Sequence, residues 1–291
     1  HKLTHENYLV NQFSPQKRNL SYLKYEEKGN NWLIDSWQLN GSFHQTEEGR
    51  QSVRGGNPDL ETQENDRIKT LGFNALLHSS RANWQATSGV DIYNDLVRSY
   101  RRDLNLITVE EQLKRGLYPD QSTAFSAAIF SLQSYQTNKG KFTGGLRYTL
   151  NRVNITDENN GSTSLSPNAL TPSFSVSRFF KNDLHSYISY SRGFRSPNID
   201  DLGTLGIVDF RYEIPTYGLR PERSDAFEFG LKLQKENFSF TGSIFQNKLS
   251  EIITREKLEG QQIEGYQVYT KKNTQAAFIS GFELSYQIKM G

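Results

Sequence analysis

The sequence predicts an all-β fold, namely a segment of an antiparallel transmembrane β-barrel with short turns at one end of its strands and long loops at the other. Three observations support this: the residue composition, a period of two in the apolar residues, and a regular alternation of short and long connections. The expected strands number about eleven. Together these observations exclude a helical domain and disfavour a soluble β-sandwich.

The composition favours strands over helices. The 291 residues include 18 Phe, 15 Tyr, 3 Trp and 22 Gly, with one Met and no Cys, a profile of strand-forming and turn-forming residues. No run of about eighteen apolar residues could form a transmembrane helix, whereas a barrel strand needs only alternate apolar residues. The 34 basic and 32 acidic residues are interspersed, without the basic stripe that nucleic-acid binding requires. We therefore expect no nucleic-acid partner, and we expect no cofactor.

Apolar residues alternate with polar residues in several long segments. The clearest is Phe278 to Lys289, where Phe278, Phe282, Leu284, Tyr286 and Ile288 share one face, interrupted only by Ser280. Similar apolar faces are Phe142, Gly144, Leu146, Tyr148 and Leu150; Phe227, Phe229, Leu231 and Leu233; Leu71, Phe73, Ala75 and Leu77; and Trp37, Leu39, Gly41 and Phe43. Successive side chains of a strand point to opposite faces, so each segment predicts a strand with one apolar face. Apolar faces this rich in rings favour a wall that has lipid on one side.

The connections between these segments alternate in length. Short turns are expected at residues 27–30, 80–83, 138–141, 180–183 and 234–237, and long polar connections at 47–65, 100–121, 154–170, 192–223 and 255–265. Outer-membrane barrels have short periplasmic turns and long external loops, whereas a soluble sandwich has no reason to sort its loops by length.

Several segments, in order along the chain, resemble the TonB-dependent outer-membrane receptor family. Gly193-Phe194-Arg195-Ser196-Pro197-Asn198 is similar to the family's FRAP box, and Leu219-Arg220-Pro221-Glu222-Arg223-Ser224 to its L-K-P-E-x-S box. Asn273 to Leu284, with Gly281 and Glu283, is similar to its N-x-x-x-A-x-I-x-G-x-E-L strand. Residues 15–20 and 115–120 resemble segments common in the same family, especially in members from the Bacteroidetes. The family-motif residues, for which we expect structural roles, are Gly193, Phe194, Arg195, Pro197, Leu219, Pro221, Glu222, Gly281 and Glu283.

The resemblance implies a barrel of about 22 strands that is closed by an N-terminal plug. HKLTHENYLV lacks an initiator Met and signal-peptide features, and ELSYQIKMG stops inside an expected strand. We therefore expect residues 1–291 to be part of one C-terminal β-barrel domain, with the plug and the last strands outside this sequence. The resemblance also implies a location in the outer membrane of a Gram-negative bacterium. Its implied partners are outer-membrane lipid, TonB acting through the plug, a small-molecule chelate ligand and a surface lipoprotein.

Two departures from the family pattern affect this interpretation. Pro215-Thr216-Tyr217 precedes the second box, where the family usually has Asn-Pro-Asn or Asn-Pro-Asp. Heme receptors of the family often carry a His between the two boxes, whereas the segment from Phe194 to Glu222 contains none. The sequence therefore disfavours heme without naming another ligand.

No motif in the sequence predicts an enzyme or a metal site. The chain has no G-x-S-x-G elbow, P-loop or H-E-x-x-H motif. Asp200-Asp201 could be paired carboxylates for acid-base chemistry, but a solvated loop is the simpler interpretation. We expect Phe194 and Arg195 to anchor the long loop to the barrel rather than to contact ligand. Rings and guanidinium groups suit bulky ligands, so the candidate ligand contacts are Arg211, Tyr212, Tyr217, Tyr100, Arg102 and Tyr118.

Three functions therefore remain open at the level of the sequence. The first is a TonB-dependent receptor that imports a scarce, bulky nutrient such as an iron-siderophore or cobalamin. The second is a passive porin or a surface-binding outer-membrane barrel. The third is a soluble carbohydrate-binding β protein, which the ring-rich face of Phe278 to Ile288 disfavours.

Overall fold

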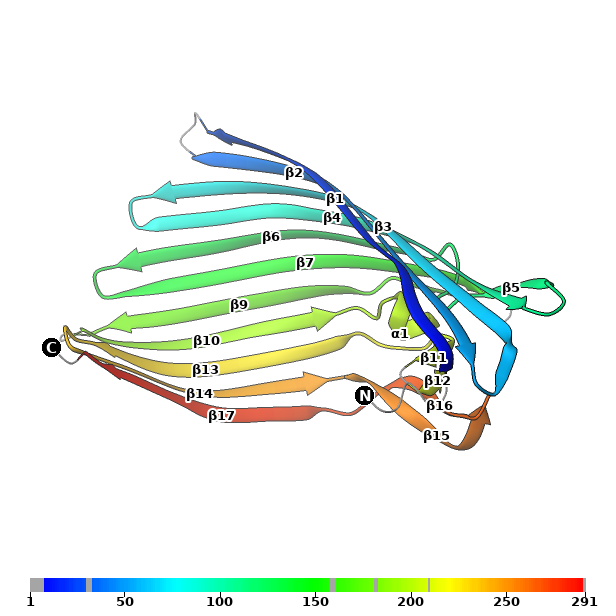
Figure 1. The fold of residues 1–291 in the computed structure, drawn as a ribbon. Helices are drawn as coiled ribbons and strands as arrows, with labels where there is room; N and C mark the ends of the chain where they lie inside the picture. Colours follow the sequence, from blue (N-terminus) through cyan, green and yellow to red (C-terminus); the bar gives the residue numbers. More distant parts are fainter. Residues whose placement is uncertain (1–7, 30–32, 158–160, 181–182, 209, 290–291) are drawn as a thin grey trace.

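The protein forms one large curved sheet with a small second sheet at one end (Figure 1). The computed structural model describes residues 8–29, 33–157, 161–180, 183–208 and 210–289. The strands of the large sheet are β1 (Tyr8–Lys28), β2 (Ser36–Arg54), β3 (Asn57–Arg81), β4 (Trp84–Asn105), β5 (Glu111–Arg115), β6 (Thr123–Thr137), β7 (Gly140–Asp157), β8 (Gly161–Leu165), β9 (Asn168–Phe179), β10 (Leu184–Arg195), β13 (Glu222–Gln234), β14 (Phe238–Ser250) and β17 (Ala277–Ile288). The small sheet contains β11 (Gly206–Val208), β12 (Arg211–Glu213), β15 (Ile253–Ile263) and β16 (Tyr266–Asn273), and the one helix among the described residues is α1 (Ile199–Gly203).

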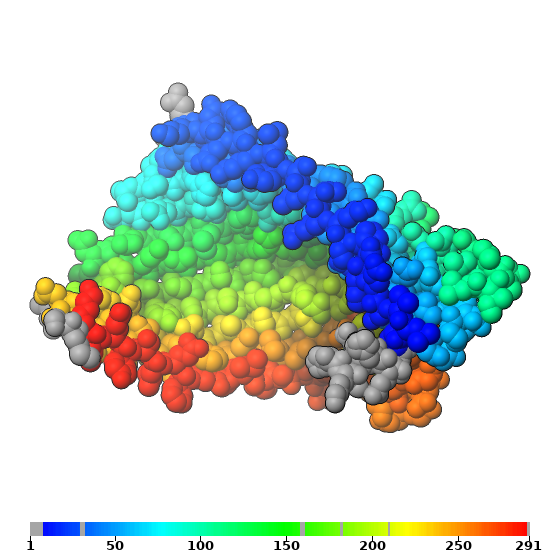
Figure 2. All heavy atoms as spheres, viewed as in Figure 1, coloured from blue at the N-terminus to red at the C-terminus, as the bar shows by residue number. Residues whose placement is uncertain are grey.

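The large sheet is an antiparallel meander, as predicted. Its main path contains eleven strands in the order β1-β2-β3-β4-β6-β7-β9-β10-β13-β14-β17, while β5 pairs with β4 and β8 pairs with β7. The sheet is not closed, and β1 and β17 are its two edges. Figure 2 shows the large sheet as a hollowed surface, with the blue β1 lying across the end that carries the long connections.

One face of the large sheet is apolar and exposed, and we call it the outer face. The predicted alternation is confirmed in the register: Ile188 of β10 lies opposite Phe229 of β13, and Tyr190 lies opposite Phe227. The rings of Tyr190 and Phe227 have centroids 4.7 Å apart. On β17 the side chain of Phe282 is 74% exposed. Exposure of so many large apolar side chains along one face suits contact with lipid acyl chains. No described helix is long and apolar enough to cross a membrane.

The opposite face, which we call the inner face, is polar and carries close contacts between glycines and rings. On β13, a Cβ added to Gly230 would lie 2.3 Å from the Tyr187 ring of β10, so only glycine leaves room for that ring. The Tyr187 hydroxyl donates to the Glu228 carboxylate. A ring that lies over a neighbouring glycine covers backbone that would otherwise be bare, and it fixes the register of the strand pair.

The connections confirm the predicted alternation, but most of the expected long loops contain strands. Residues 47–65 were expected to form a polar loop; instead β2 and β3 stay paired as far as a turn at residues 55–56. The expected loop at 255–265 is the β15–β16 hairpin, and β5 and β8 add short strands to two others. Side chains on both faces of these extended strands are polar, so the sequence shows no apolar period of two. The strands form nevertheless, because the backbone hydrogen bonds of a sheet do not depend on an apolar face.

The small sheet lies inside the end that carries the long connections (Figure 1). Its strand order is β11-β12-β16-β15, and β12 pairs with β16 in parallel, with Tyr212 opposite Val268. The helix α1 lies next to the small sheet and packs against β7 on the inner face of the large sheet. The buried cluster consists of Val97, Val153, Ile155, Ile199, Leu202 and Leu219. The long segment between β10 and β13 therefore folds inward across the end of the large sheet that carries the long connections.

Candidate functional site

The segment after β10 is fixed by a helix cap and by ion pairs. The Asn198 side chain accepts from the Asp201 amide at 2.7 Å, and the Asp201 carboxylate accepts from the Asn198 amide at 3.1 Å, which forms a capping box. Arg195 donates to Asp201 at 2.6 Å and also contacts Glu222 on β13. Glu222 accepts from the Ile253 amide at 2.7 Å. Arg195 thus links the end of β10 to α1 and, through Glu222, to β15.

The aspartate pair does not lie in a solvated loop, so that interpretation of the sequence is wrong. Asp200 and Asp201 form the first turn of α1, where the helix dipole favours acidic side chains. Asp200 accepts from the buried Lys271 of β16 at 2.8 Å. The two carboxylates have different partners, and each is used to hold the inward segment in place.

Arg115, at the end of β5, joins three parts of the structure. It pairs with the buried Asp157 of β7 at 3.0 Å and donates to the Leu117 carbonyl at 2.7 Å. It also donates to the Gly203 carbonyl at the end of α1. The sequence drew attention to the segment around Arg115 only through its resemblance to other receptors. The signal that could have identified its role is a long side chain beside the Gly116-Leu117 turn.

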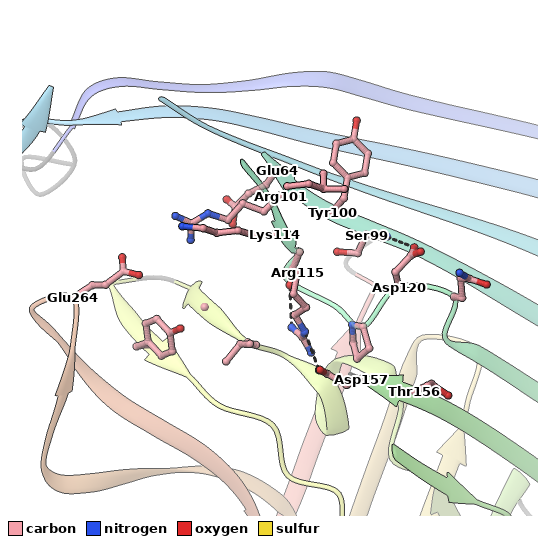
Figure 3. A pocket seen from close by; sticks show the side chains of 17 residues that line it. Glu64, Ser99, Tyr100, Arg101, Lys114, Arg115, Asp120, Thr156, Asp157 and Glu264 are labelled. Atoms are coloured by element: carbon pink, nitrogen blue, oxygen red, sulfur yellow. Dashed lines mark hydrogen bonds and ion pairs between the residues drawn. The ribbon is translucent and has the colours of Figure 1, made fainter. Parts of the chain in front are cut away.

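A cavity of about 960 Å³ lies between β4, β5 and the small sheet (Figure 3). Its walls include Tyr100, Arg101, Lys114, Arg115, Tyr212 and Glu264. A volume of this size is at the upper end of the usual range for small-molecule sites. In Figure 3 Arg101 and Lys114 project from neighbouring strands into the space that faces Glu264.

A second cavity of about 620 Å³ adjoins the first and shares Arg101, Lys114 and Glu264 with it. The turn between β15 and β16 therefore lies between the two cavities. Arg54, at the end of β2, donates to Glu264 at 3.0 Å, and its guanidinium lies 5.3 Å from the centroid of the Tyr266 ring. These contacts join β2, near one edge of the large sheet, to the β15–β16 hairpin, which precedes β17 at the other edge.

The structure separates the six candidate ligand contacts into three groups. Tyr212 lines the larger cavity, whereas Tyr100 borders it with its ring projecting away from Arg101 and Lys114 (Figure 3). Tyr118 and Tyr217 pack against the buried apolar cluster, and burial raises the pKa of both hydroxyls. The two arginines are paired: Arg102 with Glu111 at 3.1 Å and Arg211 with Glu213 at 2.7 Å.

The motif residues lie close to the strand ends and on the inner face. Gly193 lies opposite Ser224 and Phe194 opposite Arg223, in the last pairs of β10 and β13. Pro197 and Leu219 are buried, and Pro221 is half-buried. Gly281 of β17 lies below the Phe245 ring, where an added Cβ would be 2.8 Å from the ring. Glu283 follows on the same face, opposite Ser243.

The Asp66 carboxyl group, beside the cavity residue Ser99, has a raised pKa. Asp66 lies on β3 well beyond the outward apolar residues Leu71 to Leu77, and therefore outside the membrane-spanning part of that strand. Burial raises its pKa to about 6, and the Ser99 hydroxyl donates to it. The Ser99 hydroxyl also accepts from the Tyr118 amide at 3.1 Å. Asp66 thus lies below the segment that leads from β5 to β6.

The comparison with protein families decides the identity of the fold. The model of the TonB-dependent receptor-like beta-barrel matches residues 3–291. The chain belongs to the TonB-dependent receptor family. The receptors of this family are proteins of the Gram-negative outer membrane, so the short turns of this chain are periplasmic and its long connections are extracellular. A soluble carbohydrate-binding protein is therefore excluded.

Solved structures and a curated relative agree with this assignment. The copper transporter OprC has a TM-score of 0.80 at 13% identity, over 97% of this chain and 45% of that one. The hemophore receptor HasR of Serratia marcescens, solved with its hemophore HasA and heme, has a TM-score of 0.70 at 17% identity, over 98% and 48%. A probable hemoglobin and hemoglobin-haptoglobin-binding protein 4 of Haemophilus influenzae is 28% identical over 121 residues, which are 38% of this chain and 12% of the relative. The chain thus spans about half of the solved receptors and a smaller part of the curated relative.

The inner face of this receptor carries two carboxylates near its C-terminal edge. Glu228 accepts from the Tyr187 hydroxyl, and Glu283 lies across Ser243 of β14 from Gly230. Among the described residues no cation lies within ion-pair distance of either carboxylate. At these two positions the inner face offers negative charge to whatever occupies the interior of the barrel.

Proposed function

We propose that the whole protein is a TonB-dependent receptor that actively imports a scarce, bulky nutrient, namely an iron-siderophore, cobalamin or a similar chelate. The extracellular cavities bind the ligand. TonB, energised by the inner membrane, then acts on a plug to release the ligand inward. No chemistry is done on the ligand, because the receptor only binds it and lets it pass.

The observation that carries this proposal is the cover over the extracellular end of the sheet. We call this cover the roof; it consists of the segment between β10 and β13 and the β15–β16 hairpin. The segment from Ser196 to Pro221 folds inward onto the buried apolar cluster, and the β15–β16 hairpin is joined to β2 by Arg54 and Glu264. A passive porin needs an open aqueous channel, whereas a receptor for a scarce ligand needs a closed path and a binding site above it. The cavity of about 960 Å³ between this roof and the wall strands β4 and β5 is our candidate for that site.

Two carboxylates of the inner face, Glu228 and Glu283, can be contacted from the interior of the barrel. Both would be hydrated in a porin, and in a barrel filled by a plug they favour basic side chains opposite them. We propose that a plug with basic side chains contacts them. TonB would act through that plug, and a surface lipoprotein could assist ligand capture from outside.

We also propose that Arg195 and Phe194 anchor the roof rather than contact ligand. Arg195 has two carboxylate partners, Asp201 and Glu222, on either side of the inward segment. Phe194 lies opposite Arg223 in the ladder, at the point where the pairing of β10 with β13 ends.

The test of the proposed function is ligand uptake by cells that express the full-length receptor. Uptake of a labelled chelate should require the receptor and should stop when TonB is deleted. Uptake that depends on the receptor but continues without TonB would establish the porin alternative instead.

Heme is a second candidate because of two comparisons. The Haemophilus influenzae relative binds hemoglobin by its name, and HasR was solved with heme. One observation disfavours heme: no histidine among the described residues (His44, His78 and His185) lines either cavity. His44 accepts from Arg18 at 2.9 Å, and His78 contacts Thr87 at 3.1 Å. Binding of hemin by the full-length receptor, with loss when a cavity residue such as Tyr212 is changed, would place heme first.

A further inference from the structure

The charged side chains of the two adjoining cavities are already paired with one another. Arg101 and Lys114 share Asp103, at 2.7 and 2.8 Å, and this carboxylate is only 3% exposed. Arg115 pairs with Asp157, and Arg54 pairs with Glu264. These four are the lysines and arginines of both cavity walls among the described residues, and each has a carboxylate partner.

The acidic side chains of the same walls outnumber the basic ones by one. The carboxylates are Glu64, Asp103, Asp120, Asp157 and Glu264, against the four cations. Asp120 has its own partner in Arg98, at 3.1 Å, which lies outside the cavity lining. With Arg98 counted, five carboxylates face five cations, so the walls present no excess of positive charge.

A polyanionic ligand would have to compete with these internal carboxylates for every cation. The competition is unfavourable at Asp103 and Asp157, because a buried carboxylate that loses its partner stays desolvated and uncompensated. A ligand without net charge meets no such obstacle. It can stack on Tyr212 and exchange hydrogen bonds with the paired groups that line the same walls.

We propose that these cavities select a hydrogen-bonding ligand that carries no net negative charge, of the size of a metal-hydroxamate chelate or a short oligosaccharide. This inference rests on the proposed function, since it names the ligand class of the same site. It separates neutral chelates and saccharides from iron-catecholate chelates, which are polyanions.

The test uses the purified full-length receptor and three probes of similar size: a neutral ferric trihydroxamate, a neutral oligosaccharide and a ferric tris-catecholate. Titration calorimetry should show binding of a neutral probe at least about tenfold tighter than the tris-catecholate. That affinity should be nearly constant between about 50 and about 500 mM salt, because screening acts on charge pairs. Which neutral probe binds identifies the source of the ligand. Tighter binding of the tris-catecholate, or binding by none of the three, would overturn the proposal.

A charge variant gives an independent check. Glu264→Gln removes one wall carboxylate beside Arg54, so it should raise the affinity for the tris-catecholate relative to that for the neutral probe by about tenfold. Glu259→Gln on the same hairpin is the matched control, because Glu259 is 80% exposed and lies outside both cavity linings. Equal effects of the two variants on the tris-catecholate would contradict the inference.

Cell assays distinguish failure of this inference from failure of the proposed function. TonB-dependent uptake of the tris-catecholate would leave the import function intact and refute the ligand class. Binding of a neutral probe with uptake that is independent of TonB would do the reverse.

Discussion

The contacts of Arg115 predict that this one side chain fastens the roof to the wall of the barrel. Arg115→Met keeps most of the apolar stem but removes the contacts to Asp157, Leu117 and Gly203. The pair is well shielded: the side chain of Arg115 is 13% exposed and that of Asp157 is 1% exposed. Loss of one partner from a buried pair costs about 3 to 5 kcal/mol, and we take about 3 kcal/mol because the roof can relax toward water.

Hydrogen exchange at Leu205 measures this loss directly. The Leu205 amide donates to the Leu117 carbonyl at 2.9 Å, and that carbonyl also accepts from Arg115. If exchange proceeds through opening of the roof, a loss of about 3 kcal/mol speeds it by about 100-fold. Amides in the β13–β14 ladder, far from Arg115, should keep the exchange rates of the parent protein.

Arg98→Met is the matched control for Arg115→Met. Arg98 lies on β4 and pairs with Asp120 at 3.1 Å, but about half of each side chain is exposed. Exposed pairs contribute at most about 1 kcal/mol, so exchange at Leu205 should change by less than about fivefold. Unchanged exchange at Leu205 in Arg115→Met, with the protein folded, would refute the assignment of Arg115 as the fastening residue.

Three further predictions follow from single contacts. Gly230→Ala should lower the free energy of unfolding by about 2 kcal/mol in a urea titration, because its Cβ would collide with the Tyr187 ring. Adding Tyr187→Ser should restore most of this loss, whereas Gly144→Ala, at an outer-face site with room, should cost less than about 1 kcal/mol. The unfolded chain loses the Asp66 proton near pH 4 but the folded protein keeps it to about pH 6, so stability falls as pH rises through that window. Asp66→Asn should therefore be about 3 kcal/mol more stable than the parent at about pH 7.5 and equal to it below about pH 4. Arg195→Ala should increase proteolysis of the roof in whole cells, while Arg195→Lys should retain part of the protection, since a lysine cannot reach both carboxylates with a planar fork.

The strands of the membrane-spanning wall could be predicted from the sequence because lipid imposes a period of two. Phe278, Phe282, Leu284 and Tyr286 fall on one face of β17, as expected, and Ser280 interrupts that face without changing the register. The short turns follow from the same pattern, since each joins two strands whose apolar faces must match. Here one physical constraint, an apolar surface on one side, acts on every second residue.

The extracellular parts could not be predicted in the same way because no single apolar face constrains them. The extension of β2 and β3 beyond the membrane is polar on both faces, so its ladder was interpreted as a loop. The parallel pairing of β12 with β16 joins three-residue and eight-residue strands that are more than fifty residues apart in the chain. The helix α1 is one turn long, too short for an apolar period. Its one local signal was Asn198 three residues before Asp201, the spacing of a capping box.

The chemistry of the roof is consistent with a structure that has to open. Its nearly buried Glu213 accepts from two cations, Arg211 and Arg255. Buried ion pairs of this kind add little net stability compared with apolar packing of the same volume, but they define one geometry sharply. Charged groups also regain hydration when they separate, whereas an apolar interface exposed to water does not. A roof closed by ion pairs can therefore hold one closed arrangement without the large cost of opening that a fully apolar seal would impose.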